Sequence, residues 1–491
     1  MKPGKKLLVF LFLIFNTIFA SGQSMNTIKL KNTTIKIEKQ KYLVSKGNIL
    51  VKSDHTYPNA ALIEIPVIII HTTNKAPKEP IFWLAGGPGV SNMKQKPSKI
   101  LLENHDFVLV GYRGVDGSVN LKSRNIKKAV KGLNDSLLSN ESLLNVQSGI
   151  EKYIKDLQKD SINLKNFTII DVINDLEDVR KSLAYNKINL LSASYGTRVA
   201  LLYGYCYPNA INRSVMVGVN PPGHFVWWPQ KTEQIISEYD SILQSKGEIS
   251  DGLTINKSIE LSFSNIPKRW TLFKLDAEKI KATSFVLMYR KQSAVMVFDA
   301  YKRAATKGDY SGLYLMQLAY DYLVPGMFTW GDLFNKGASA DLNRNINYKE
   351  LLKPEKTKIG APLSLLIWGG GEKWPDITIE EEYKKAQYSL TETLMIGGNL
   401  DISTPPEYAA GELLPIMPNA KQIILKDMAH VDDLMYLQRD AFNSLISTYY
   451  DTGKVDSTLF SDDTVEFKTP VSFNGIAKVL YPVVFVMSIF K

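Results

Sequence analysis

Apolar and polar residues alternate over the first part of the chain. Between residues 27 and 75 the alternation runs through short segments such as TIKIE, KYLVS and ALIEIPVIII. A period of two residues is typical of strands that bury one face and expose the other. The pattern therefore predicts antiparallel strands that lead into a larger sheet.

Further along the chain, short apolar runs are separated by stretches with helical periodicity. The runs IFWL, FVLV and INLL contain no polar alternation apart from one Asn, which is typical of strands buried on both faces. In residues 171–183, Val172, Leu176, Val179 and Leu183 fall on one face of a helix. Strands that alternate with helices at this spacing predict an α/β fold with a mostly parallel central sheet.

This alternation is interrupted between residues 225 and 358, where helical patterns such as GLYLMQLAYDYLV and SFVLMYRKQSAVMVFDAYKRAA dominate. Afterwards strand-like runs return in LSLLIWGGG, TLMIGGNLD and QIILKDMAH, with a helix expected around IEEEYKKAQ. We therefore predict a mainly helical cap over residues 225–358, inserted into a core made of residues 23–224 and 359–455. An insertion at the carboxyl ends of the strands would cover the edge where open α/β sheets hold their sites.

The N-terminal segment, residues 1–22, has the pattern of a secretory signal peptide. Three lysines precede the apolar run from Leu7 to Ala20, and the small residues Ala-Ser-Gly follow. The apolar run is short for a membrane-spanning helix, which disfavours an uncleaved anchor. We therefore expect the protein to be exported and to work in the periplasm or outside the cell.

The C-terminal tail, residues 456–491, ends in the apolar run VLYPVVFVMSIFK. The run is too short to cross a bilayer. We expect it to pack against the protein, and a weak, shallow association with a membrane surface is the alternative.

Charge and cysteine content narrow the function classes. The formal net charge is +10, but the basic residues are scattered among acidic ones, so we expect no nucleic-acid partner. The single cysteine, Cys206, excludes an intramolecular disulfide, and we expect it to be a small apolar residue in a helix.

A candidate nucleophile lies in the segment Ser192-Ala193-Ser194-Tyr195-Gly196, between the apolar run INLL and a helical pattern. Small residues on both sides of a serine are required where a strand turns sharply into a helix and holds the hydroxyl outward, as in the pattern G-x-S-x-G. The spacing makes Ser194 the nucleophile and places Ser192 where the first glycine of that pattern stands.

A serine hydroxyl needs a base, and the base needs a group that orients it. His430 follows the strand-like QIILKDMA, and Asp401 directly follows TLMI, so both fall at carboxyl ends of predicted strands. In hydrolases with this kind of turn the acid and the histidine follow the serine along the chain, which excludes the three early histidines. His224 is expected to line a pocket or to have a structural role. The rival acids, Asp427 and Asp432, are too near His430 in sequence to orient it easily.

The same chemistry requires hydrogen-bond donors for a developing oxyanion. We expect one to be the backbone N–H of Tyr195 and the other to come from Gly86 or Gly87 in LAGGPG. A phosphate-binding loop is excluded because no Gly-Lys-Ser/Thr follows these glycines. No metal ion and no organic cofactor is implied.

Four segments together resemble a known family: WLAGGPG, VGYRGVDGS, LLSASYGTRVALLYGYCYP and IGGNLDISTPPEYA with the later MAH. They are similar to the prolyl-aminopeptidase and tripeptidyl-aminopeptidase branch of the α/β-hydrolases, over residues 60–225 and 360–440. The resemblance implies an α/β-hydrolase fold with a helical cap, and a serine peptidase that releases residues from peptide N-termini. Ala85 stands where prolyl aminopeptidases usually carry a histidine, which favours the tripeptidyl type. The turn GYRGVDGS carries Asp116 in place of a commoner Gly-rich form, and the sequence does not predict the effect of Asp116.

An aminopeptidase has to bind the N-terminal ammonium of its peptide, and a carboxylate of the cap is the simplest partner. The candidates are Glu233, Glu238, Asp240, Asp299, Asp321 and Asp332. Trp227 and Trp228 are candidate walls of an apolar pocket, although packing of the cap onto the core explains them equally well. A carboxylesterase or lipase is the alternative function, because the same residues cleave esters. A non-catalytic binding protein on this scaffold is a further alternative.

Overall fold

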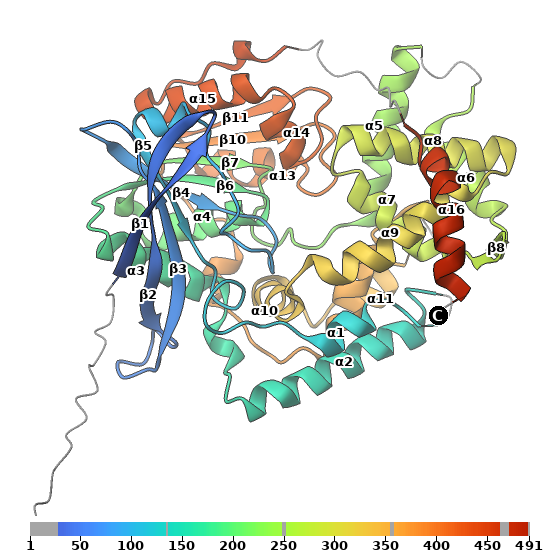
Figure 1. The fold of residues 1–491 in the computed structure, drawn as a ribbon, viewed down its shortest axis with the longest axis horizontal. Coiled ribbons are helices and arrows are strands. Elements are labelled where there is room, and N and C mark those ends of the chain that lie inside the picture. Colours follow the sequence, from blue (N-terminus) through green and yellow to red (C-terminus); the bar gives the residue numbers. More distant parts are fainter. Residues whose placement is uncertain (1–27, 134–135, 248–251, 354–357, 462–470, 490–491) are drawn as a thin grey trace, which may run out of the picture.

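The computed structural model describes residues 28–133, 136–247, 252–353, 358–461 and 471–489. The predicted signal peptide, residues 1–22, lies outside the described residues. Figure 1 shows a sheet in the left half of the molecule and a region of helices in the right half.

In the part of the chain that the structure describes, one sheet contains nine strands in the order β1-β2-β3-β5-β4-β6-β7-β10-β11. Their bounds are Ile28–Ile37 (β1), Gln40–Lys52 (β2), Leu62–Ile70 (β3), Lys78–Leu84 (β4), His105–Val110 (β5), Ile188–Ala193 (β6), Ile211–Val217 (β7), Thr393–Gly398 (β10) and Ala420–Leu425 (β11). The first three strands pair antiparallel with one another, and β3 pairs antiparallel with β5. All other pairs are parallel. The predicted mixed, mostly parallel sheet is therefore confirmed.

Burial follows the apolar runs of the sequence. Every residue of β6 and of β10 is buried, whereas β1 exposes most of its length. The helices that precede β10 outside the stretch between β7 and β10 are Arg124–Ala129 (α1), Asn140–Lys159 (α2), Ile169–Ser182 (α3) and Tyr195–Cys206 (α4), and those after β10 are Pro406–Glu412 (α13), Val431–Tyr436 (α14) and Arg439–Thr452 (α15). Helices α1 and α2 lie beside the helices of the right half in Figure 1. Helix α3 begins with a capping box between Thr168 and Asp171, which satisfies backbone N–H groups that have no partner within the helix.

Between β7 and β10 the chain leaves the sheet and forms the helical region. Its elements are Pro229–Ser245 (α5), Ile255–Ser264 (α6), the hairpin Arg269–Trp270 (β8) and Phe273–Lys274 (β9), Ala277–Leu287 (α7), Lys291–Lys307 (α8), Ser311–Met327 (α9), Trp330–Asp341 (α10) and Tyr348–Leu351 (α11). We call this region the cap. The helical pattern expected over residues 284–305 is divided between α7 and α8, because the chain leaves the helix at Met288–Arg290.

The prediction of a strand at LSLLIWGGG is wrong. The segment is helical over Pro362–Ser364 (α12) and Leu365–Gly369, and its residues are buried. A short apolar run cannot be distinguished from a buried helix by periodicity alone, and here Pro362 opens the first turn. The prediction of a helix around IEEEYKKAQ is also wrong, since this segment forms only the short 3₁₀ helix Glu381–Lys384. The sheet therefore resumes at β10.

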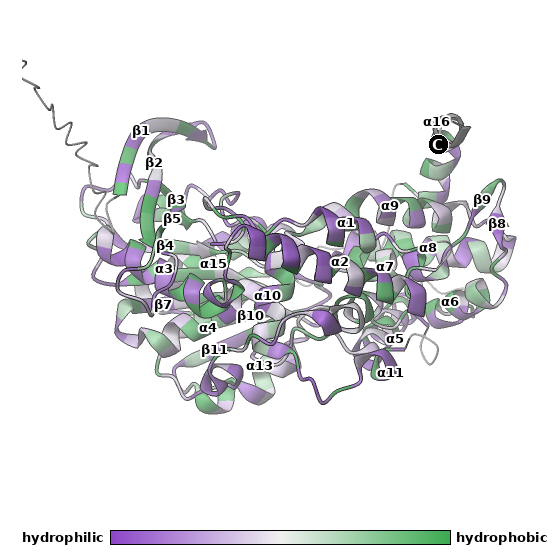
Figure 2. Ribbon diagram, turned by 90° about the horizontal axis from the view of Figure 1, so that it is seen from below, coloured by the Kyte–Doolittle hydropathy of each residue, from purple (hydrophilic) through white to green (hydrophobic). Residues whose placement is uncertain are grey.

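The C-terminal helix Phe473–Ile489 (α16) packs against the cap. The Asn474 amide donates hydrogen bonds to Asp309 O (3.0 Å) and Ser311 Oγ (3.1 Å), and Lys478 forms an ion pair with Asp309 (2.8 Å). The Tyr481 ring lies 5.5 Å from that of Trp270, and Figure 2 shows α16 beside β8 and β9 at the same end of the molecule. Among the described residues, no helix is both long and apolar enough to cross a membrane.

Candidate active site

Ser194 occupies a strained turn between β6 and α4. Its backbone has φ +53° and ψ −127°, a conformation that non-glycine residues rarely adopt and that costs about 1–3 kcal/mol. The Ser194 N–H donates to Val217 O (2.8 Å), and the Ser194 carbonyl accepts hydrogen bonds from the N–H and the hydroxyl of Thr197 (2.9 and 2.6 Å). The turn is therefore held from both sides, and the serine is partly exposed while the residues around it are buried.

The small neighbours of Ser194 have separate roles. A Cβ on Gly196 would lie 2.2 Å from Leu84 O and 2.6 Å from Ala85 O, so only glycine allows α4 to start against the end of β4. Ser192 is fully buried, and its hydroxyl donates to Val215 O (3.1 Å). Ser192 is thus part of the scaffold, in the position that sequence analysis assigned to it.

The structure brings His430 and Asp401 together. His430 Nδ1 lies 2.8 Å and 3.0 Å from the two Asp401 carboxylate oxygens. The Asp401 carboxylate is buried and accepts hydrogen bonds from the N–H groups of Ser403 and Thr404 and from the Thr404 hydroxyl (2.9, 2.8 and 2.8 Å). An ionised carboxylate only accepts hydrogen bonds, so Nδ1 carries the proton and Nε2 of a neutral ring is left as an acceptor.

Ser194 and His430 converge on the turn after β7. Val217 O accepts the N–H of Ser194, and a Cβ on the next residue, Gly218, would lie 3.1 Å from His430 Cε1. The hydrogen bonds among the described residues include none between Ser194 Oγ and His430. In hydrolases without substrate this contact is often long and shortens only when substrate binds.

The loop expected to hold the oxyanion lies directly against Ser194. A Cβ on Gly86 would be 2.8 Å from Ser194 Cβ, and Gly87 has φ +127°, which favours glycine. Tyr195 is the first residue of α4, where backbone N–H groups have no partner within the helix. Tyr195, which follows the serine, and Gly86, whose Cβ would contact it, therefore lie next to Ser194, as expected of one donor from Tyr195 and one from Gly86 or Gly87.

Two residues that sequence reasoning did not assign hold this loop in place. The buried Asn92 amide accepts the N–H of Ala85 (2.7 Å) and donates to Trp83 O and Val110 O (2.9 and 2.8 Å). Asp116 accepts the backbone N–H of Asn92 (2.9 Å). Asp116 thus fixes the loop indirectly, while nothing in the sequence pattern pointed to Asn92.

Asp332 of α10 reaches the same loop from the cap. Its carboxylate accepts the N–H of Gly89 (3.0 Å) and pairs with Lys336 Nζ (2.6 Å), and neither residue is appreciably exposed. Burial raises the pKa of Asp332, and the ammonium of Lys336 opposes that rise. Lys336 also donates to Arg113 O (3.1 Å). Asp332 therefore joins the cap to the core.

The other acidic candidates of the cap are engaged elsewhere. Glu233 accepts the N–H groups of Ile359 and Gly360, and the partners of the remaining ones are Gln234 for Glu238, Ile255 and Asn256 for Asp240, Arg303 for Asp299 and Lys279 for Asp321. None of the six predicted carboxylates is among the described residues that line the cavity next to Ser194. Binding of a substrate amine by a carboxylate of the cap stays a prediction.

A cavity of about 530 Å³ opens at Ser194 between core and cap. Core residues and cap residues both line it, and most are apolar: Gly87, Val90, Ser194, Tyr195, Asn220, Phe225, Trp227, Val286, Leu287, Tyr289, Arg290, Gln292, Ser293, Met296, Met327, Phe328, Leu333, Leu363, Ser403, Thr404 and Asp432. Asp432 is the only acidic residue among these described lining residues, and its carboxylate pairs with Arg290 Nε (2.6 Å).

The two tryptophans and His224 separate in the structure. Trp227 lines the cavity and donates through Nε1 to Ser403 Oγ (3.2 Å). Trp228 precedes α5 and is not among the described lining residues. His224 lies outside the lining as well, where it pairs with Glu412 (2.6 Å). Of Trp227, Trp228 and His224, only Trp227 is among the described residues that line the cavity.

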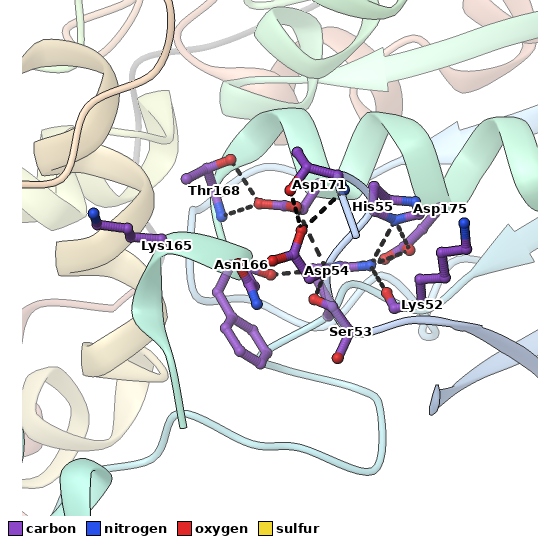
Figure 3. A network of polar contacts seen from close by, with 12 residues as sticks. Lys52, Ser53, Asp54, His55, Lys165, Asn166, Thr168, Asp171 and Asp175 are labelled. Atoms are coloured by element: carbon purple, nitrogen blue, oxygen red, sulfur yellow. Dashed lines mark hydrogen bonds and ion pairs between the residues drawn. The ribbon is translucent and has the colours of Figure 1, made fainter. Parts of the chain in front are cut away.

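A second polar cluster surrounds Arg113, in the turn after β5. Its guanidinium is fully buried, pairs with Asp175 of α3 and donates to the carbonyls of Ser53 and Asn166 (3.1 and 2.7 Å). Figure 3 shows Asp175 and His55 facing each other across this cluster. Each nitrogen of Arg113 has a partner, so the cluster is a structural anchor for the end of β5.

The described residues contain no group of three or more His, Cys, Asp or Glu side chains that could hold a metal ion.

Known proteins match this chain in part. Tripeptidyl aminopeptidases from Streptomyces coelicolor and Streptomyces lividans are each 24% identical over 206 residues, which cover 39% of this chain and 38% of those proteins. The chain thus spans well under half of the length of these curated relatives. A serine hydrolase from Cycloclasticus zankles aligns with 87% of this chain and 100% of that chain, at 10% identity and a TM-score of 0.37.

The family model of the α/β hydrolase fold matches residues 79–432, which include the loop of Gly86 and Gly87, the turn at Ser194, the cap and His430. This range covers most of the chain. The chain belongs to the α/β-hydrolase fold family.

Proposed function

We propose that the protein is a serine hydrolase in which Ser194, His430 and Asp401 form the catalytic triad. The observation that carries this proposal is the buried Asp401–His430 contact beside a strained serine turn. His430 Nε2 removes the proton of the Ser194 hydroxyl as Oγ attacks the carbonyl carbon of the substrate, and Asp401 stabilises the imidazolium that forms. The backbone N–H of Tyr195 and one from the Gly86–Gly87 loop stabilise the oxyanion.

The second half of the reaction uses the same groups. His430 gives its proton to the leaving group, and the acyl chain remains on Ser194. Water then loses a proton to His430 and attacks the acyl carbon, and the proton returns to Ser194 as the acid leaves. The reaction balances as hydrolysis and needs no cofactor.

We propose that the substrates are peptides with free N-termini, and that release of a short N-terminal fragment is favoured over release of proline. The resemblance of four segments to aminopeptidases, the distant similarity to tripeptidyl aminopeptidases and Ala85 support this. Asp432 supplies the cavity wall with a carboxylate that pairs with Arg290, and a substrate ammonium would share that carboxylate with the guanidinium. Asp432 lies in α14, whereas the sequence analysis expects the partner of the ammonium in the cap.

Ester hydrolysis is the second candidate function, because the cavity wall is largely apolar. Met296, Met327, Phe328, Leu333 and Leu363 all face the cavity and would accommodate an acyl chain. The triad itself does not distinguish an ester from an amide.

A substrate panel tests these alternatives. Purified protein and Ser194→Ala are offered fluorogenic tripeptides with free and acetylated N-termini, together with short-chain esters, and both are treated with a fluorophosphonate. We expect labelling and turnover of free peptides only in the wild-type protein. Equal turnover of acetylated peptides, or a preference for esters, would contradict the aminopeptidase proposal. Absence of both labelling and turnover would contradict the hydrolase proposal.

We also propose that the protein is exported and acts in the periplasm or outside the cell, on the basis of residues 1–22. N-terminal sequencing of protein recovered from its native compartment tests this, and we expect the mature chain to begin near residue 23. Recovery of the full-length chain from the cytoplasm would contradict it.

A further inference from the structure

One face of the molecule exposes a group of large apolar side chains. It is formed by α1, the second half of α9, the hairpin of β8 and β9, and α16, which lie along the same edge in Figure 2. Helix α9 packs against both α1 and α16. The exposed apolar residues of this face are Leu272, Tyr322, Leu323, Met327, Val479 and Leu480. Single exposed apolar residues are ordinary on a protein surface, whereas a group of them marks a binding surface.

Aromatic contacts hold the hairpin against both α9 and α16. The ring of Trp270 in β8 lies 5.1 Å from that of Tyr314 in α9 and 5.5 Å from that of Tyr481 in α16. Phe273 of β9 contacts the same two rings. Leu272, at the tip of the hairpin, is 60% exposed. The hairpin is therefore fixed in place, and its tip presents an apolar side chain to solvent.

Helices α9 and α16 extend the apolar surface. Leu323 and Met327 are four residues apart in α9 and so lie on one side of that helix, and Leu323 is 59% exposed. Val479 of α16 is 78% exposed, although this helix packs on the cap through Asn474. Met327 also lines the cavity at Ser194. The apolar surface therefore reaches from the end of the cap to the wall of the cavity.

Basic residues adjoin these apolar side chains. Lys127 Nζ lies 3.8 Å from the position that a Cβ on Gly326 would take, which places α1 beside the exposed end of α9. The sequence distributes the basic residues over separate segments, and the fold brings them to one face. The exposed basic residues in and next to α1 and the hairpin are Lys122, Arg124, Lys127, Lys128, Lys131, Lys268, Arg269 and Lys274.

The acidic residues of the same face are paired or buried. Among the described residues of α1, α9, α16 and the hairpin, Asp321 is the one acidic residue, and it pairs with Lys279 (2.7 Å). Just before α9, Asp309 pairs with Lys478 (2.8 Å). Asp276, which follows the hairpin, is buried. The face therefore carries a net positive charge.

We propose that this face, which we call the docking face, binds the surface of an anionic lipid bilayer. The apolar side chains enter the interfacial region and the basic side chains contact anionic headgroups, so that the two contributions add. Trp270 and Tyr322 suit this depth, because Trp and Tyr are favoured at a membrane–water interface. A soluble polyanion would leave the apolar side chains in water, and a neutral apolar partner would leave the basic residues unmatched. Docking of this kind does not depend on the proposed function.

Sedimentation with vesicles tests the proposal, with the chain that begins at residue 23, the form expected after export. The vesicles consist of phosphatidylcholine alone, or of phosphatidylcholine and phosphatidylglycerol in equal parts. The controls change exposed residues of the same kinds in or next to β11, which lies toward the opposite edge in Figure 2. The docking-face variants are Lys127→Gln/Lys128→Gln, Leu272→Gln and Leu323→Gln, and the controls are Lys421→Gln/Lys426→Gln and Ile424→Gln.

We expect the wild-type protein to bind the anionic vesicles, and to bind pure phosphatidylcholine at least about 10-fold more weakly. The double lysine variant should weaken binding to anionic vesicles by roughly 10- to 30-fold and each leucine variant by roughly fivefold, while the controls stay within about twofold of wild type. Raising the salt from about 0.1 M to about 1 M should weaken binding, because the Debye length falls from about 10 Å to about 3 Å. The thermal midpoint reports whether each variant is folded.

Three results overturn the proposal. Equal binding of the wild-type protein to both kinds of vesicle would show that the basic residues do not select the surface. Equal losses in the docking-face variants and the β11 controls, or no loss in either, would show that binding does not use this face. Failure to bind either kind of vesicle would exclude the bilayer, and binding of heparin in its place would identify a soluble polyanion as the partner.

Discussion

Replacing Asp332 by asparagine should separate the structural contribution of the cap from its contribution to catalysis. Asparagine keeps an oxygen acceptor for the N–H of Gly89 and removes the negative charge. Lys336, whose side chain is 3% exposed, is then left with its hydrogen bond to Arg113 O and its position over the Tyr112 ring. The perturbation is therefore a buried ammonium without its carboxylate.

The size of the effect follows from the geometry. Unit charges 2.6 Å apart attract by about 6 kcal/mol at an effective dielectric constant near 20. Much of this attraction is offset in the native protein by desolvation of both ions. Removing one partner of a buried pair destabilises by roughly 3–5 kcal/mol, and the remaining contacts of Lys336 place our expectation near 3 kcal/mol. The thermal midpoint should fall by about 3 °C, because a chain of 491 residues unfolds with an entropy of about 1 kcal/mol per kelvin at roughly 2.1 cal/mol/K per residue.

Thermal unfolding and the rate of fluorophosphonate labelling measure the two consequences. Asp299→Asn is the matched control, because Asp299 and Arg303 are also four residues apart on a cap helix but partly exposed. The free energy of unfolding of this control should fall by less than about 1 kcal/mol. Asp332→Asn/Lys336→Met removes both charges and should recover most of the stability. We expect labelling of Asp332→Asn to slow by roughly 10-fold, because Gly89 continues the loop of the oxyanion donors.

Two results would refute this reasoning. If the free energy of unfolding of Asp332→Asn is within about 1 kcal/mol of the wild-type value, the ion pair is not the main interaction that holds the cap to the loop. If the double variant is no more stable than Asp332→Asn, the loss comes from the altered contact with Gly89 and not from the buried charge.

Three further predictions concern the turn, the cavity and the C-terminal helix. Gly196→Ala should destabilise by about 3 kcal/mol and abolish fluorophosphonate labelling, since its Cβ would meet Leu84 O at 2.2 Å; normal labelling would contradict the turn geometry. Asp432→Asn should raise KM for free-amine peptides by roughly 10-fold and leave acetylated peptides unchanged, with the exposed Asp440→Asn as control; equal KM values would exclude Asp432 as the amine partner. Against the opposing effect of burial, hydrogen bonds chiefly from Lys478 and Ser311 lower the pKa of Asp309 to about 2. This depressed pKa stabilises α16 above about pH 4, and the stabilisation is lost as the pH falls through 2. The difference in thermal midpoint between wild type and Asp309→Asn should therefore narrow from pH 6 to pH 3, and a constant difference would contradict it.

The parts of the fold that sequence predicts best are those in which local pattern and burial agree. The runs IFWL, FVLV and INLL are strands because their apolar residues are buried on both faces, and β6 is buried throughout. The turn at Ser194 was predictable for a different reason. Gly196 has no room for a side chain, and that local restriction is visible as a small residue in the sequence.

The parts that sequence misses depend on distant neighbours. LSLLIWGGG is buried as a helix, and its apolar residues carry no sign of which element they form. Asp332 and Lys336 are four residues apart in α10, the spacing of an ordinary solvated ion pair on a helix surface. Only the packing of α10 against the core makes them a buried pair. The role of Asn92 also depends on the fold, because its amide holds the loop through hydrogen bonds with the backbone of Ala85, Trp83 and Val110.

The contacts of α10 change how the boundary between core and cap should be understood. Thr329, just before α10, donates its N–H to Gly89 O (2.8 Å), and Asp332 accepts the N–H of the same glycine. Both backbone groups of Gly89 are therefore held by the cap, and Gly89 follows the predicted oxyanion glycines by two residues. Leu333 of α10 also lines the cavity. Helix α10 belongs to the cap by sequence but contacts the loop beside Ser194, so the cap both lines the cavity and holds the loop that carries Gly86, Gly87 and Gly89.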